Sequence, residues 1–259
     1  MTQGDSTASG QWHLEALLGE PMYDLDDRVA IVTGAAGNLG GAVARAFWAA
    51  EARLVLVDRG TDRLPQLFPD LVDSPRAFLA TSVNLADTTA VDAMVSATLE
   101  RFGQIDVLVN AVGGWRGGTA VHETPLDTWD LLMDLNVRTM IVVSSAVIPV
   151  MLKQGSGKIV NVAARAGLSG SSKGGAYSAA KSAVIRLTES MSAELKNSGI
   201  NVNCVLPATI DTPQNRADMP KSDVGRWVKP QAIADVILFL ASDAAQAIQG
   251  AAIPVYGRG

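Results

Sequence analysis

Short apolar runs rich in β-branched residues alternate with longer segments of helical periodicity over most of the chain. The apolar runs are Val29–Thr33, Leu54–Asp58, Ala77–Thr81, Val107–Asn110, Lys158–Val162, Val202–Leu206 and Ala252–Val255. The helical segments are Leu39–Ala50, Thr88–Phe102, Pro125–Lys153, Ala176–Lys196 and Gln231–Leu240. Strands and helices that alternate in this way form a parallel sheet covered by helices on both faces. We therefore predict an α/β fold with a seven-stranded, doubly wound parallel sheet.

The length and the even pattern indicate one domain. Open α/β folds of about this size often form a single domain, and no linker or change in composition divides the chain after residue 28. We predict a domain over 28–259 and an N-terminal extension over 1–27. The extension is polar except for a patch from Trp12 to Leu18, which we expect to pack on the surface or at a subunit contact.

Charge and composition exclude several classes of function. The 26 acidic residues outnumber the 21 basic ones, and no basic stripe is present, which argues against a nucleic-acid partner. The single cysteine, Cys204, lies in an apolar run and cannot form an internal disulfide, so we interpret it as a core residue. With only two histidines besides, a metal site is not expected.

No targeting or membrane segment is expected. The N-terminus lacks the basic and apolar regions of a signal peptide. The longest apolar stretch, Met140 to Leu152, contains two serines and a proline and is too short to span a bilayer. We therefore expect a cytoplasmic protein that acts on a small molecule and has no membrane partner.

A glycine-rich turn follows the first expected strand. Glycines in Thr33-Gly-Ala-Ala-Gly-Asn-Leu-Gly40 permit a tight turn and let a pyrophosphate approach the N–H groups at the start of a helix. The second strand ends at Asp58, 18 residues after Gly40. A carboxylate there accepts hydrogen bonds from the adenosine ribose and repels a 2′-phosphate. The sequence predicts a Rossmann-type site for NAD(H). NADP(H) is the less favoured alternative, kept open because Arg59 follows the acid.

Tyr177 and Lys181 form a candidate acid–base pair. Four residues apart on a helix, they lie on one face. A phenol is a poor acid–base catalyst at its free pKa of about 10, and a neighbouring cation lowers that pKa into a working range. Amphipathic helices often contain this spacing by chance, so the pair gains weight only beside the glycine-rich turn and Asp58.

With these features in register, residues 28–259 resemble the short-chain dehydrogenase/reductase family. Its turn, Thr-Gly-x-x-x-Gly-x-Gly, is matched by Thr33, Gly34 and Gly40, with Asn38 in place of the middle glycine. Asparagine tolerates a positive φ better than most residues, so we expect the turn to survive. Asn110-Ala-Val-Gly113 resembles the family's Asn-Asn-Ala-Gly segment.

The resemblance implies the roles of individual residues. Tyr177 is the proton donor, Lys181 modifies its pKa and binds the nicotinamide ribose, and Asn136 helps to hold a water near the lysine. The implied cofactor-binding residues are Gly34, Asn38, Leu39, Gly40, Asp58, Asn110, Ala111, Val112, Lys181, Pro207, Ile210 and Thr212. In the family, the two longest helices pair across a two-fold axis, which implies a homodimer or a homotetramer.

Ala164 departs from the family pattern. Asn161-Val-Ala-Ala-Arg-Ala-Gly167 aligns with Asn-x-Ser-Ser-x-x-Gly, whose serine hydrogen-bonds the reacting carbonyl oxygen. Loss of one such donor typically costs about 10²–10³ in rate. Ser171 and Ser172 are candidate substitutes in the following loop.

Three segments resemble the quinonoid dihydropteridine reductase branch of the family. They are Gly113–Gly118, with Trp115 between glycines, the serine-free Ala163–Gly170, and Val205–Arg216. That branch reduces an already polarised ring, for which a carbonyl donor matters less. The implied substrate-binding residues are Trp115, Ala164 and Asn215, although Trp115 could instead fill a core gap and Asn215 could belong to a helix start. The alternatives are a general carbonyl or alcohol oxidoreductase and a non-catalytic NAD-binding module.

Overall fold

The computed structural model of the chain describes residues 23 and 25–258 and contains one parallel sheet of seven strands. The strand order is β3-β2-β1-β4-β5-β6-β7. The strands are β1 (Val29–Thr33), β2 (Arg53–Val57), β3 (Ala77–Ala80), β4 (Val107–Asn110), β5 (Gly157–Val162), β6 (Ile200–Pro207) and β7 (Ala252–Val255). Each predicted apolar run forms a strand whose ends differ from the prediction by at most two residues. The α/β class and the doubly wound sheet are confirmed.

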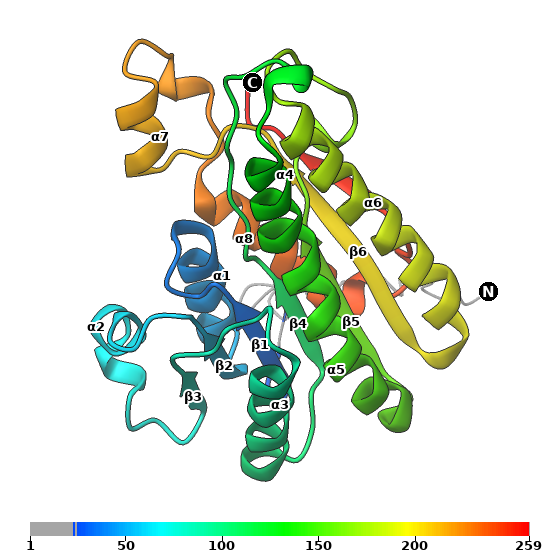
Figure 1. Ribbon diagram of the computed structural model, residues 1–259. Coiled ribbons are helices and arrows are strands. Elements are labelled where there is room, and N and C mark those ends of the chain that lie inside the picture. The colour runs from blue at the N-terminus through cyan, green and yellow to red at the C-terminus, as the bar shows by residue number, and fades with distance from the viewer. Residues whose placement is uncertain (1–22, 24, 259) are drawn as a thin grey trace, which may run out of the picture.

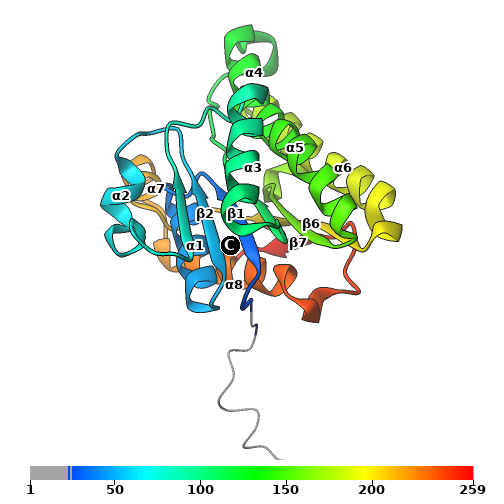
Figure 2. The same cartoon turned by 90° about the horizontal axis from the view of Figure 1, so that it is seen from below.

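Helices cover both faces of this sheet. They are α1 (Asn38–Ala49), α2 (Arg63–Leu67), α3 (Thr88–Phe102), α4 (Leu126–Met133), α5 (Thr139–Gln154), α6 (Gly175–Leu195), α7 (Pro213–Asp218) and α8 (Pro230–Ala241). Figures 1 and 2 show α1 and α8 on one face and α3, α5 and α6 on the other. The short α2 and α7 were not predicted, because five or six residues give too little periodicity to detect.

The central strand β1 supplies side chains to a core on each face of the sheet. Val29 and Ile31 pack into the core under α3 and α5, whereas Ala30 and Val32 pack into the core under α1 and α8. All five residues of β1 are buried. A strand buried on both faces shows a continuous apolar run because successive side chains point to opposite sides.

The segment predicted as one helix over Pro125–Lys153 contains a change of helical geometry. Five residues, Asp134–Arg138, form a π-helical turn that joins α4 to α5. The whole segment, Leu126–Gln154, is long and apolar enough to cross a membrane if only length and composition are considered. Core helices meet the same criterion. Here Val143, Val147 and Met151 pack into the core on the sheet.

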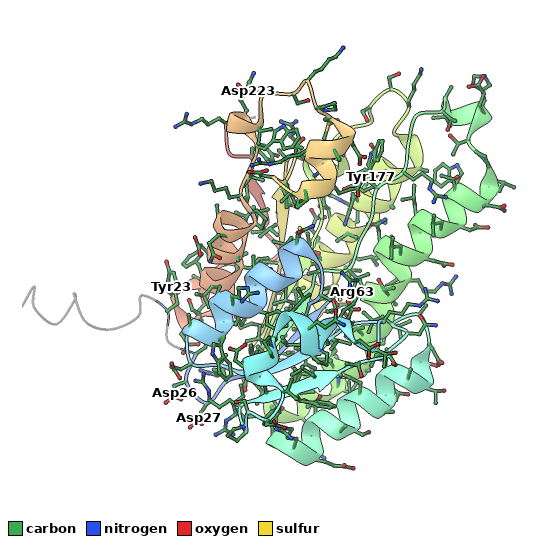
Figure 3. All side chains as sticks on the ribbon, turned by 90° about the vertical axis from the view of Figure 1, so that its left-hand side faces the viewer. Tyr23, Asp26, Asp27, Arg63, Tyr177 and Asp223 are labelled. Carbon is green, nitrogen blue, oxygen red and sulfur yellow. The ribbon has the colours of Figure 1, made fainter. Side chains whose placement is uncertain are left out.

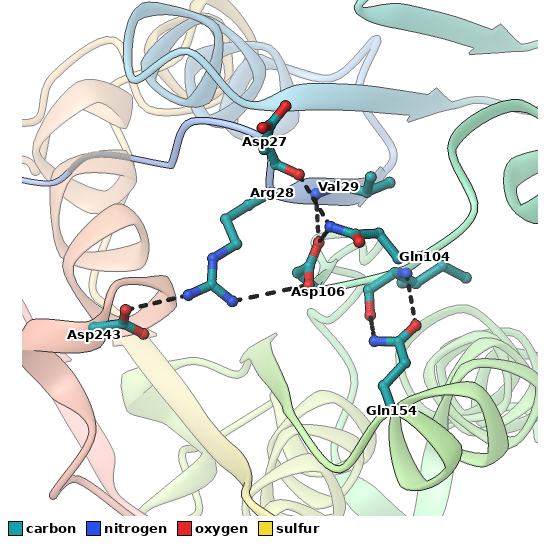
Figure 4. Close-up of polar contacts among 8 residues, drawn as sticks. Asp27, Arg28, Val29, Gln104, Asp106, Gln154 and Asp243 are labelled. Atoms are coloured by element: carbon teal, nitrogen blue, oxygen red, sulfur yellow. Dashed lines mark hydrogen bonds and ion pairs between the residues drawn. The ribbon is translucent and has the colours of Figure 1, made fainter.

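Polar contacts join the loops at the amino ends of the strands (Figure 4). Arg28 lies between Asp106, 3.8 Å away, and Asp243, 3.2 Å away. Asp106 also accepts hydrogen bonds from the backbone N–H of Val29 (2.8 Å) and from the side chain of Gln104 (2.7 Å). These contacts connect the start of β1 to the loop before β4 and to the segment after α8.

The predicted extension falls mostly outside the described residues, including the patch from Trp12 to Leu18. Of the described residues before β1, Leu25 is buried in the core, and the ring of Tyr23 lies 5.5 Å from that of Phe239. The domain boundary at residue 28 stays a prediction.

Candidate active site and cofactor-binding cleft

The carboxyl ends of β1 and β4 lie side by side in the sheet, where the strand order reverses. In doubly wound sheets, ligands bind in the crevice at this point. The hydroxyl of Thr33 donates to the carbonyl oxygen of Val109 (3.2 Å) and accepts from the N–H of Ala111 (3.0 Å). The glycine-rich turn and the segment after β4, both predicted to bind the cofactor, therefore form one wall.

Backbone geometry explains two of the glycines in the turn. Gly34 has a φ of +65°, and a Cβ on Gly40 would lie 2.1 Å from the carbonyl oxygen of Gly34. The turn survives with Asn38, as expected, but not through a positive φ, because Asn38 begins α1 in helical geometry. Leu39 is buried in the core, so only its backbone can face a ligand. Gly37 precedes α1 without a side-chain cap, which leaves N–H groups for an anion.

Asp58 follows β2 directly and is 8% exposed. Its Oδ1 accepts a hydrogen bond from the N–H of Gly60 (2.8 Å) and lies 3.9 Å from Nη1 of Arg63. Nη2 of Arg63 donates to the carbonyl oxygen of Ala36 in the glycine-rich turn (2.8 Å). Figure 3 labels Arg63 at the start of α2. The sequence interpretation named Arg59 and missed Arg63, whose position depends on the unpredicted α2.

Tyr177 and Lys181 both lie on α6, and Lys181 is 4% exposed. Nζ of Lys181 donates to the carbonyl oxygen of Val162 at the end of β5 (2.8 Å). Burial lowers the pKa of Lys181 to about 8 and raises the pKa of Tyr177 to about 12. The predicted lowering of the tyrosine pKa by the cation is therefore wrong for the protein alone, because burial dominates. The phenol keeps its proton at neutral pH, as a proton donor requires.

Asn136 lies in the π-helical turn and is 2% exposed. Its side chain accepts from the N–H of Gly114 (3.2 Å) and donates to the carbonyl oxygens of Gly114 (3.1 Å) and Leu132 (3.0 Å). A Cβ on Gly113 would lie 2.8 Å from Oδ1 of Asn136 and 3.0 Å from Nζ of Lys181. Gly113 therefore lies between Asn136 and Lys181, two of the three predicted catalytic residues. Turns of π-helix often occur at functional sites.

The site that lacks the family serine is well defined. Ala164 follows β5 and is 7% exposed, and its methyl group has no hydrogen-bond donor in the place of the serine hydroxyl. Oγ of Ser171 lies 2.6 Å from where a Cβ on Gly174 would stand, three residues before Tyr177.

Trp115 is 67% exposed. The alternative that Trp115 fills a core gap is therefore wrong.

In the segment after β6, the side chains of Thr212 and Asn215 form hydrogen bonds with residues of the same segment. Ile210 pairs with Val228 in an isolated bridge, three residues beyond the strand end at Pro207. The hydroxyl of Thr212 caps α7 by accepting from the N–H of Asn215 (3.1 Å). The side chain of Asn215 donates to the carbonyl oxygen of Ile210 (2.8 Å). This matches the helix-start alternative for Asn215.

Asn110 is buried and has a structural side chain. Its Nδ2 donates to Asn161 on β5 (2.9 Å) and to Ser144 on α5 (3.2 Å), so both hydrogens of this amide are used within the protein. Nearby, Val112 packs against Gly34, because a Cβ on Gly34 would lie 3.0 Å from Cγ2 of Val112.

Within residues 23 and 25–258, no group of three or more His, Cys, Asp or Glu residues is arranged to hold a metal ion.

Comparisons with known proteins agree with this architecture. The sequence profile described as short chain dehydrogenase matches residues 28–223. The chain is 35% identical to 2-(R)-hydroxypropyl-CoM dehydrogenase of Xanthobacter autotrophicus, over 89% of this chain and 97% of that protein. It is also 35% identical to meso-2,3-butanediol dehydrogenase of Serratia marcescens, over 90% and 94%. The crystal structure of gox2181 superposes with a TM-score of 0.84 at 31% identity, over 90% of this chain and 95% of that one. The chain belongs to the short-chain dehydrogenase family.

Proposed function

We propose that this protein is an NADH-dependent reductase in which Tyr177 donates the proton. The family uses NAD(H) or NADP(H). Two observations support a dinucleotide in this chain: the uncapped start of α1, and a Gly40 with no room for a side chain. Asp58 supports NADH over NADPH because its carboxylate would repel a 2′-phosphate. When bound, the reduced nicotinamide supplies a hydride.

The protein's own side chains manage the proton. Tyr177 carries a proton at neutral pH, since burial raises its pKa to about 12. The charge of Lys181 would stabilise the phenolate that remains after proton donation. Asn136 holds the loop at Gly114 beside that charge. One hydride and one proton together reduce the substrate by two electrons.

The proposed class of substrate rests mainly on Ala164. A buried alanine at this position cannot polarise a carbonyl group, so the substrate best suited to the site is already polarised. Quinonoid dihydropterin, or a similarly electron-poor ring, meets that condition. The exposed indole of Trp115, in a loop rich in glycine, offers a flat surface on which such a ring could stack.

A second candidate is a reductase of ordinary ketones or a dehydrogenase of alcohols. Its support comes from the relatives, because the names 2-(R)-hydroxypropyl-CoM dehydrogenase and meso-2,3-butanediol dehydrogenase describe oxidation of alcohols. This candidate needs another donor for the carbonyl oxygen. Ser171 and Ser172, in the loop before α6, are the candidates, and Oγ of Ser171 lies 2.6 Å from where a Cβ on Gly174 would stand.

The test is NADH oxidation with freshly generated quinonoid dihydropterin, compared with a matched panel of ketones and aldehydes. Turnover of the pterin alone supports the first candidate. Turnover of the carbonyl panel overturns it in favour of the second. Tight NADH binding without turnover of any substrate would indicate a binding module instead of an enzyme.

We also propose that the protein is a homodimer or a homotetramer in the cytoplasm. The large apolar side chains of Leu126 and Leu131 on α4 and of Ile141 on α5 are exposed, which supports pairing through these helices. The free, buried Cys204 fits a reducing compartment. Sedimentation equilibrium gives the oligomeric state, and a monomer at micromolar concentration would contradict the first part.

A further inference from the structure

We propose that a pocket at the start of α6, lined by the residue before Tyr177, binds an anionic group, a carboxylate or a phosphate, carried by the substrate. The inference rests on the proposed function because it narrows the class of substrate. The pocket has a volume of about 190 Å³ and lies between the loop after β4, the start of α4 and the start of α6. Its charged lining residues are Arg116 and Lys173, and no carboxylate is among the described residues that line it.

These two cations have no acidic partner in the described part of the chain. Neither Arg116 nor Lys173 forms an ion pair there. Two positively charged residues that line one concavity raise its electrostatic potential, and an anion bound there is attracted to both. An arginine also presents a planar fork of N–H groups that matches a carboxylate or a phosphate.

The backbone and a hydroxyl add neutral donors to the pocket. Gly175 and Ala176 line it and begin the 21-residue helix α6, whose start has no side-chain cap. The first N–H groups of a helix lack partners within it, and the helix dipole favours negative charge at that end. Thr128 of α4 also lines the pocket. The pocket thus combines two charged donors with neutral ones.

Two loops connect this pocket to the catalytic pair. Ala176 directly precedes Tyr177 in sequence. Gly117 lies four residues after Gly113, which abuts Lys181, and four extended residues span at most about 14 Å. The N–H of Gly118 donates to the carbonyl oxygen of Lys173 (2.8 Å), so each loop holds the other in place.

The first experiment measures anion binding without catalysis. Inorganic phosphate is titrated by calorimetry into the protein saturated with NAD⁺, so that the cofactor's pyrophosphate site is filled, at constant ionic strength. We expect Arg116→Gln and Lys173→Gln each to weaken phosphate binding at least about tenfold, since charge-assisted hydrogen bonds are lost. Lys153→Gln, on the exposed end of α5, is the matched control and should bind like the wild type.

The second experiment asks whether the substrate uses the pocket. Two substrates that differ only in a carboxylate or its methyl ester are compared, and the ratio of their kcat/KM values is measured for each protein. We expect the preference for the acid to fall at least about tenfold in Arg116→Gln and Lys173→Gln but not in Lys153→Gln.

The outcomes show separately whether the proposed anion pocket or the proposed reaction is wrong. No phosphate binding to the wild type, equal binding to all variants, or an unchanged acid-to-ester ratio overturns the pocket. If no substrate is turned over, the proposed function fails, whereas the calorimetry still decides the pocket by itself.

Discussion

The ammonium of Lys181 donates a hydrogen bond to the carbonyl oxygen of Val162, 2.8 Å away, and so fastens α6 to the end of β5. The contact holds a cation in a position that is 4% exposed. Gly113 approaches the same ammonium from the loop after β4. Residues from three separated segments therefore surround one buried charge.

Burying this charge should cost stability in a pH-dependent way. The pKa of Lys181 falls from 10.5 to about 8, so the folded state binds the proton less well than the unfolded state. The cost is fully present below about pH 8 and disappears as the pH rises from about 8 to about 10.5. We expect Lys181→Met to be inactive yet more stable than the wild type by about 1–3 kcal/mol at neutral pH.

Urea unfolding at about pH 7 and about pH 10 measures this difference. The advantage of Lys181→Met should shrink at the higher pH. An advantage that grows with pH, or a destabilised variant at neutral pH, would show that the buried ammonium is not costly.

Tyr177→Phe removes the proton donor and keeps the ring. We expect turnover to fall about 10²–10⁴-fold, the range of general acid catalysis. Fluorescence titration should give a dissociation constant for NADH close to that of the wild type. Full activity in this variant would show that another group donates the proton.

Gly40→Ala tests the close approach in the glycine-rich turn. The new Cβ would stand 2.1 Å from the carbonyl oxygen of Gly34. We expect about 1–3 kcal/mol of destabilisation and at least about tenfold weaker NADH binding, although alanine is intrinsically the better helix former. Gly170→Ala is the control, because no atom lies within 4 Å of its Cβ position. Thermal unfolding and NADH titration of both variants should separate them.

Ala164→Ser tests the interpretation of the missing serine. We expect activity on ketones to rise by up to about 10²–10³, with little change for a quinonoid ring. Ala163→Ser, whose side chain packs in the core beside β6, is the control and should bring no gain. If Ala164→Ser leaves ketone reduction unchanged, the hydroxyl position does not limit the reaction.

Arg63 and Asp58 should set the choice of cofactor in opposite directions. Asp58→Ala removes a charge that repels a 2′-phosphate, so we expect the ratio of NADPH to NADH use to rise at least about tenfold. Arg63→Ala removes a cation 3.9 Å from that carboxylate, and the ratio should fall. The kcat/KM values for both cofactors measure it. A larger effect of Arg59→Ala than of Arg63→Ala would assign the role to the other arginine.

The sequence predicted what depends on local pattern. The strands were predictable because runs such as Val29–Thr33 are buried on both faces and bounded by turns. The turn Thr33–Gly40 was predictable because only glycine permits its contacts. Tyr177 and Lys181 followed from their spacing once that turn was recognised.

Features that depend on tertiary placement could not be predicted. The contact between Arg63 and Ala36 requires the orientation of α2, a helix of five residues. The raised pKa of Tyr177 comes from burial, which spacing on a helix does not reveal. Similarly, Arg116 and Lys173 are 57 positions apart in sequence, and only the fold brings them to one pocket.

The π-helical turn at Asp134–Arg138 places one extra residue within the helical segment Leu126–Gln154. A π-helical turn takes up one residue more than an α-helical turn, so removing one residue here would let an uninterrupted α-helix form with its two halves in nearly their present orientation. Secondary structure and solubility could survive such a deletion. The bulge that holds the amide of Asn136 against Gly114 would nevertheless be lost. The length of this segment, and not only its composition, therefore determines where Asn136 lies in the candidate site.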